Sequence, residues 1–195
     1  MYRLAFLLFV IVLISMTGSD ILYNKKTVKI LEHSQINILG STNVNSFTCE
    51  LNVSEINSVV NVYYNKNQRK ILFDNTALHI DVGCFDCGSR LMNSDFKELL
   101  KKDIYPEIVL ELKEIAMSPK NNNDVLAYMA IYLAGETRLY SFPLKVENED
   151  QMHIYGCLSL TLSDFNLDAP TKALGLIVVS DQIEINIDLL VNPLE

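Results

Sequence analysis

The sequence lacks the short motifs that mark common catalytic sites. It contains no G-x-G-x-x-G or P-loop segment, and none of its serines stands in a G-x-S-x-G setting. Its three histidines and its scattered cysteines do not supply the four ligands, at suitable spacing, that a zinc site needs. We therefore expect no catalytic residues, no metal and no cofactor, and we interpret the chain as a non-enzymatic protein.

Positive charge is also scarce. The chain has 24 acidic and 16 basic residues, and its formal net charge is −8 at pH 7. An acidic surface without a basic patch argues against nucleic acid as a partner, and against electrostatic docking on anionic lipid.

No hydrophobic run is long enough to span a bilayer comfortably. The longest, at 4–14, has eleven residues, whereas a transmembrane helix needs roughly 20. Arg3 precedes this run and the small residues Thr17, Gly18 and Ser19 follow it, which is typical of a secretory signal peptide. We predict that 1–19 is a leader, that 20–195 is a single domain without a stable membrane span, and that the protein is exported.

Apolar residues recur at every second position between turn signals, which is the period of a half-buried β-strand. The clearest run, 182–189, alternates isoleucine or leucine with polar side chains. Similar alternation occurs within 47–53, 78–84, 129–133, 140–146 and 152–162. One-sided strands joined by short turns predict an all-β fold, an antiparallel barrel of about eight strands. A sandwich with a helix on one edge is the structural alternative, which periodicity cannot distinguish.

One helix interrupts the strand pattern, near residues 94–102. Asn93 or Ser94 can cap its first turn. Its apolar face comprises Phe96, Leu99 and Leu100. We expect this short helix to lie across one side of the barrel.

Four cysteines permit three complete pairings, which sequence alone cannot resolve. We favour a disulfide between Cys49, on the strand nearest the N-terminus, and Cys87, just past a strand end. Closing that loop would contribute about 4 kcal/mol in the chain-entropy model. Cys157 falls on the polar phase of its strand, so it is either a free thiol or the partner of Cys84.

The chain resembles the YceI-like family in five stretches that occur in the family's order. These are 33–50 (HSQINILGSTNVNSFTCE), 93–108 (NSDFKELLKKDIYPEI), 132–146 (YLAGETRLYSFPLKV), 159–170 (SLTLSDFNLDAP) and 174–191 (LGLIVVSDQIEINIDLLV). The resemblance implies an extended, lipocalin-like barrel with a helix across one side. It also implies a bacterial protein, periplasmic or secreted, that holds an isoprenoid or a similar long-chain lipid. Pairing into a homodimer is a further possibility, because barrels of this family often pair.

Apolar residues of the predicted strands and helix would face the barrel interior and form a lipid cavity. They are Phe47, Leu78, Ile80, Val82, Leu91, Met92, Phe96, Leu110, Ile131, Leu158, Leu160, Leu162 and Phe165. Core packing alone would also explain such a set. Arg90 matches the family's arginine and would either meet the polar head of a ligand or anchor the helix through an ion pair or backbone bond.

Three functions remain open from the sequence. The leading hypothesis is a non-enzymatic, exported binder of an isoprenoid or fatty-acyl lipid. The second is a barrel filled by side chains that acts as a protein-interaction or structural module. The third is a thiol-redox enzyme that uses the C-x-x-C of Cys84 and Cys87.

Overall fold

The computed structural model describes residues 22–121, 123–148 and 151–194. Within them, eight antiparallel strands form a closed ring, because the first strand pairs with the last. In spatial order they are β1 (Asn24–Ile30), β4 (Val59–Asn67), β5 (Lys70–Asp74), β8 (Glu107–Met117), β9 (Asp124–Leu133), β10 (Glu136–Asn148), β11 (Met152–Thr161) and β14 (Gln182–Leu194). The predicted all-β, antiparallel, lipocalin-like architecture is confirmed, although the ring is not a regular barrel.

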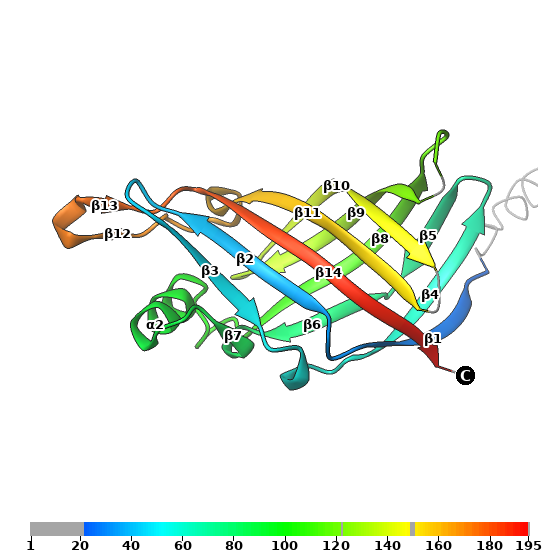
Figure 1. Ribbon diagram of the computed structural model, residues 1–195, viewed down its shortest axis with the longest axis horizontal. Helices are drawn as coiled ribbons and strands as arrows, with labels where there is room; N and C mark the ends of the chain where they lie inside the picture. Colours follow the sequence, from blue (N-terminus) through cyan, green and yellow to red (C-terminus); the bar gives the residue numbers. More distant parts are fainter. Residues whose placement is uncertain (1–21, 122, 149–150, 195) are drawn as a thin grey trace, which may run out of the picture.

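The ring is irregular because two of its strands, β14 and β8, each pair along one edge with two different strands in succession. Strand β14 pairs with β2 (Gln35–Ser41) through 184–188 and with β1 through 191–194. Strand β8 pairs with β6 (Ala77–Asp81) through 107–111 and with β5 through 114–116. One end of the molecule is therefore closed by β1, β4 and β5, and the other by β2 and its neighbours (Figure 1).

At this second end, β2 pairs with β3 (Ser46–Leu51), which in turn pairs with the two-residue strand β7 (Phe85–Asp86). The turn η2 (Val82–Cys84) connects β6 directly to β7, so the backbone itself bridges the two sides of the ring. The remaining elements are η1 (Val53–Glu55), η3 (Leu162–Phe165), η4 (Ala173–Gly175) and a small hairpin of β12 (Thr171–Lys172) and β13 (Ile177–Val178).

A two-residue turn sets the register between β9 and β10. Ala134 and Gly135 both have positive φ, 50° and 91°, which is the conformation that a type I′ hairpin turn requires. Leu133 then lies opposite Glu136. A Cβ on Gly135 would come within 2.7 Å of the Tyr105 ring, so this position needs glycine for space as well as for conformation.

The helix α2 (Arg90–Leu99) begins and ends earlier than the predicted 94–102. Ser89, not Asn93 or Ser94, is its N-cap: the Ser89 hydroxyl accepts a hydrogen bond from the Met92 N–H at 3.2 Å. The helix ends because Lys101 turns into the left-handed region, with φ at 54°. Its predicted apolar face is confirmed: Leu100 is buried, and Phe96 and Leu99 pack against the core.

The predicted alternation is also confirmed over parts of the long strands, where inward residues are buried or partly buried and outward residues exposed, at 125–128, 157–160 and 182–188. At the end of the ring away from α2, side chains fill the interior. These residues are Val125, Ala127, Phe142, Leu144, Ile187 and Val191. The part of the interior near α2 is not filled in this way.

Phe165 tests the packed core beside the unfilled region. It is fully buried and stacks on Tyr140, with 6.1 Å between the ring centroids. Phe165→Ala should lower the free energy of unfolding by about 3–5 kcal/mol, because it leaves a cavity that the surroundings cannot close. The control is Leu139→Ala on the outer face of β10, which should change it by less than about 0.5 kcal/mol. Urea denaturation measures both, and similar losses would contradict this description of the core.

Candidate functional site

An apolar cavity of about 470 Å³ lies beneath α2, at the end where the ring is completed by β2, β3, β7 and β6. Because neighbouring strands are antiparallel, the last residues of β2, β9 and β11 meet the first residues of β3, β8 and β14 at this end. Three cross-strand pairs contribute side chains to its wall: Ile38 with Cys49, Leu110 with Ile131, and Leu160 with Ile183.

The cavity brings together eight of the residues that the sequence nominated. They are Phe47, Leu91, Met92, Phe96, Leu110, Ile131, Leu160 and Leu162. Five others lie elsewhere in the apolar interior, where Ile80, Val82, Leu158 and Phe165 are buried and Leu78 is partly buried. They do not line the cavity, and they pack within the apolar core beside it.

Arg90 is exposed at the start of α2 and is not among the residues that line the cavity. It makes no ion pair within the part of the chain that the structure describes. The cavity wall therefore contains no guanidinium from this position.

Polar groups are concentrated at the outer end of the cavity. Thr42, Asn45 and Ser46 come from the turn between β2 and β3, and Lys172 comes from the β12–β13 hairpin. The Lys172 Nζ lies 2.7 Å from Asp95 Oδ1 on α2, so the two charged lining residues neutralise one another.

The cavity reaches the surface at this outer end. Leu91 lines the cavity although its side chain is 71% exposed. The hairpin also contributes Pro170, Ile177 and Val179 to the lining. The sequence pattern did not indicate the hairpin, because two-residue strands carry too little periodicity to be distinguished from a loop.

The wall beside α2 includes a disulfide between Cys49 and Cys87, which confirms the predicted pairing. It extends the short ladder between β3 and β7. That ladder contains only Glu50 opposite Asp86 and Leu51 opposite Phe85, and Cys49 and Cys87 occupy the next positions in the same register. The disulfide therefore reinforces a pairing of only two residue pairs beside the cavity.

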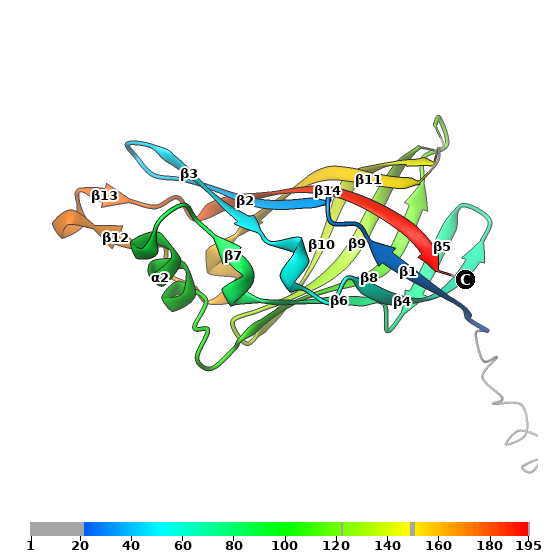
Figure 2. The same ribbon diagram turned by 60° about the horizontal axis from the view of Figure 1, so that its bottom comes forward.

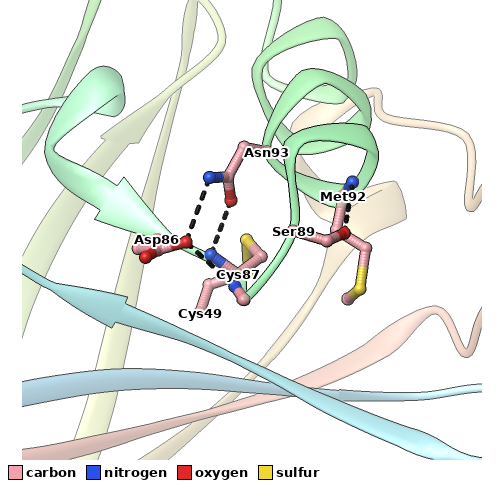
Figure 3. Close-up of a disulfide and its surroundings, with 7 residues drawn as sticks. Cys49, Asp86, Cys87, Ser89, Met92 and Asn93 are labelled. Atoms are coloured by element: carbon pink, nitrogen blue, oxygen red, sulfur yellow. Dashed lines mark hydrogen bonds between the residues drawn. A yellow bond between two sulfur atoms is a disulfide. The ribbon is translucent and has the colours of Figure 1, made fainter.

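A hydrogen-bond network joins this disulfide to the helix (Figure 3). Asn93, in the first turns of α2, accepts a bond from the Cys87 N–H at 2.6 Å and donates one to Asp86 Oδ1 at 3.0 Å. Asp86 also accepts from the Gly88 N–H at 2.9 Å. The amide of Asn93 and the Gly88 N–H lower the pKa of the Asp86 carboxyl, because they stabilise its charged form. Asn93, a predicted cap, instead binds the helix to the strand before it.

The two remaining cysteines do not pair. Cys84 is half-buried and Cys157 exposed, and both are free thiols. Because Cys87 is bonded to Cys49, Cys84 and Cys87 do not form a redox-active pair here. Burial is the main cause that raises the pKa of each free thiol, which keeps the less reactive protonated form.

An antiparallel ring closed on itself, with an enclosed apolar cavity that opens at one end, defines a lipocalin-like class of protein. A model of the YceI-like domain matches residues 28–191. The chain therefore belongs to the YceI-like family, as the resemblance in the sequence indicated. A search of curated proteins finds no match.

Solved structures share this fold at low sequence identity. BcnA of Burkholderia cenocepacia is 18% identical with a TM-score of 0.60, over 82% of this chain and 96% of that one. A polyisoprenoid binding domain from Saccharophagus degradans, implicated in plant cell wall breakdown, is 13% identical with a TM-score of 0.58, over 85% and 97%. A YceI protein of Campylobacter jejuni is 13% identical with a TM-score of 0.53, over 69% and 80%.

The predicted leader, 1–19, lies outside the described residues. Among the residues described, no helix is both long enough and apolar enough to cross a membrane.

The disulfide should stabilise both the fold and the helix over the cavity. The double variant Cys49→Ser/Cys87→Ser should lose up to about 4 kcal/mol of unfolding free energy, because the disulfide closes a 38-residue separation in the unfolded chain. Amide hydrogen exchange in α2 should also become faster, since its attachment to β3 is lost. Cys84→Ser/Cys157→Ser is the matched control and should retain most of its stability. Equal losses in the two double variants would contradict the assignment.

Proposed function

We propose that this protein is a non-enzymatic binder of a long-chain amphiphile, an isoprenoid or fatty-acyl lipid, in the cavity beneath α2. The observation that carries the proposal is the composition of the wall, which is hydrocarbon along its depth and polar only at its opening. Such a wall binds by removing methylene groups from water, at about 0.8 kcal/mol for each buried group. The similar domain from Saccharophagus degradans adds support, since it is a polyisoprenoid binding domain.

The volume of the cavity limits the length of chain that can be enclosed. A cavity of about 470 Å³ that opens at one end would enclose part of a long hydrocarbon chain, and the rest of the chain would extend through the opening beside Leu91. The cavity is also within the range of about 300–1,000 Å³ that small-molecule sites occupy.

Export is part of the proposal. The predicted leader, 1–19, would direct the chain out of the cytoplasm, and the Cys49–Cys87 disulfide suits the oxidising compartment that it would reach. Sequencing the N-terminus of the mature protein tests this: a chain that still begins at Met1 in the exported fraction would contradict leader removal.

Native mass spectrometry of the purified protein is the first test of the ligand. We expect a bound species of a few hundred daltons that solvent extraction removes and that lipid analysis identifies as an acyl or prenyl compound. The same spectrum reports whether the protein is a monomer or the homodimer that the family resemblance suggests. A bare polypeptide that takes up neither palmitate nor farnesol would contradict the proposal and favour a filled barrel with a protein partner.

A cavity-filling variant tests the location of the site. Leu110 lines the cavity on β8, and Leu110→Trp would place an indole where the chain should lie. Affinity for the fluorescent fatty acid cis-parinaric acid should fall at least about tenfold, because the enclosed volume is lost. Overpacking costs about 1–3 kcal/mol of stability, so thermal unfolding must confirm that the variant is folded.

Leu139→Trp is the matched control, since it adds the same indole to the exposed outer face of β10. It should bind cis-parinaric acid as the parent protein does. Unchanged affinity in folded Leu110→Trp would place the ligand elsewhere.

A further inference from the structure

Exposed apolar side chains surround the opening of the cavity. They come from three segments that are far apart in the sequence: the β2–β3 turn, the start of α2, and the β12–β13 hairpin, which lie together at one end of the molecule (Figures 1 and 2). We call this group the rim; it comprises Val44, Leu91, Leu174, Leu176 and Val178. Leu174 is the most exposed, at 106% of its reference area, and Leu176 follows at 75%.

The rim is held in place rather than loosely attached. The Asn43 side chain on the β2–β3 turn donates to the Leu176 carbonyl at 2.9 Å and accepts from the Val178 N–H at 3.0 Å. The Ser180 N–H donates to the Ser41 carbonyl at 2.8 Å. Together with the Lys172–Asp95 ion pair, these bonds fasten the hairpin to both the turn and the helix. The exposed leucines therefore project from a braced structure.

Acidic residues are absent from the two loop segments of the rim, although the protein as a whole is acidic. The chain has 24 acidic residues, yet the segments 41–46 and 169–180 contain none. The only charge in the two segments is Lys172, and Arg90 adds a second exposed positive charge on α2. Asp95 is paired with Lys172, so it neutralises one positive charge and adds no free negative one. The argument from net charge against electrostatic docking on anionic lipid concerns the whole surface, whereas the two loop segments of the rim carry no acidic residue.

We infer that the rim is a docking surface for a lipid bilayer, which it enters by inserting Leu174 and Leu176 so that the cavity opens onto the membrane. This inference rests on the proposed lipid-binding function. A long-chain amphiphile is scarcely soluble in water, and its free energy along a path between bilayer and cavity is lowest if the apolar chain never crosses water.

Two features favour a bilayer over a protein partner or a second copy. The apolar residues protrude from the tips of a turn and a hairpin, a shape that suits insertion among headgroups better than flat packing. The rim is also continuous with the cavity, because Leu91 belongs to both. Apolar residues beside Arg90, which makes no ion pair among the described residues, suit the headgroup and acyl boundary of an anionic membrane.

Vesicle flotation tests the inference with single substitutions. The vesicles contain three parts phosphatidylcholine to one part phosphatidylglycerol, and the protein is the full mature chain. Leu174→Asp and Leu176→Asp should each lower the vesicle partition coefficient about tenfold, since each removes an inserted side chain and adds a negative charge. The matched control is Leu139→Asp: Leu139 is 76% exposed, as Leu176 is at 75%, but lies on the outer face of β10. It should leave the partition coefficient unchanged.

A second measurement separates docking from ligand binding. Transfer of cis-parinaric acid from the vesicles into the protein should slow about tenfold in the two rim variants. The equilibrium affinity for cis-parinaric acid in buffer without vesicles should stay the same, because neither residue lines the cavity.

The outcomes distinguish failure of the inference from failure of the proposed function. A parent protein that binds cis-parinaric acid but does not float with vesicles would overturn the docking inference and leave the cavity as a lipid site. Flotation that depends on the rim without any cis-parinaric acid uptake would overturn the lipid cavity and keep the docking surface. An equal fall of the vesicle partition coefficient in all three aspartate variants would overturn the assignment of the rim as the docking surface. A dimer that rim substitutions convert to a monomer would also overturn it, and would identify a second copy as the occupant.

Discussion

The cavity depends on a very short β-ladder. Two residue pairs between β3 and β7, followed in register by the Cys49–Cys87 disulfide, complete the ring at the end beneath α2. Backbone hydrogen bonds over so few pairs contribute little net stability in water, and a covalent bond at the next position maintains the closure. The Asn93 network then carries this constraint into the helix, because it joins Cys87 and Asp86 to the first turns of α2. The ladder therefore fixes the start of α2, while the core packing of Leu100 and the Lys172–Asp95 ion pair hold the rest of the helix.

The same topology explains why one end is filled and the other hollow. Where β1, β4 and β5 close the ring, Val125 and Phe142 project into an interior narrow enough for side chains to fill. Toward α2, β14 passes from β1 to β2 and β8 from β5 to β6, which widens the enclosed space. Aliphatic side chains from opposite strands therefore do not touch one another there, and they line a cavity. A protein core is normally close-packed, so a cavity of this size that stays apolar is a feature that needs a functional account.

The opening combines charge neutrality with exposed hydrocarbon. Lys172 and Asp95 bring the hairpin and the helix together without leaving either charge free in the cavity wall. Around them, leucine and valine side chains are exposed to solvent. A contiguous group of exposed apolar side chains marks a site of interaction with a hydrophobic partner. An amphiphile in the cavity and a bilayer at the rim account for both features with one ligand chemistry.

The sequence predicted the strand alternation because side chains of a strand alternate between the two faces of a sheet. This alternation does not depend on which strands pair with each other. It identified Ile131, Leu160 and Ile183 as inward residues, and the placement of Cys49 on a strand led to the correct disulfide. The helix boundaries were shifted because Ser89 and Asn93 are equally good caps in sequence, and only the contact of Asn93 with Cys87 distinguishes them. Periodicity also could not separate Phe165, which fills the core, from Phe47, which lines the cavity. Inward direction is a local property of each strand, whereas a cavity exists only where the ends of distant strands are held apart, and that was decided by the tertiary structure.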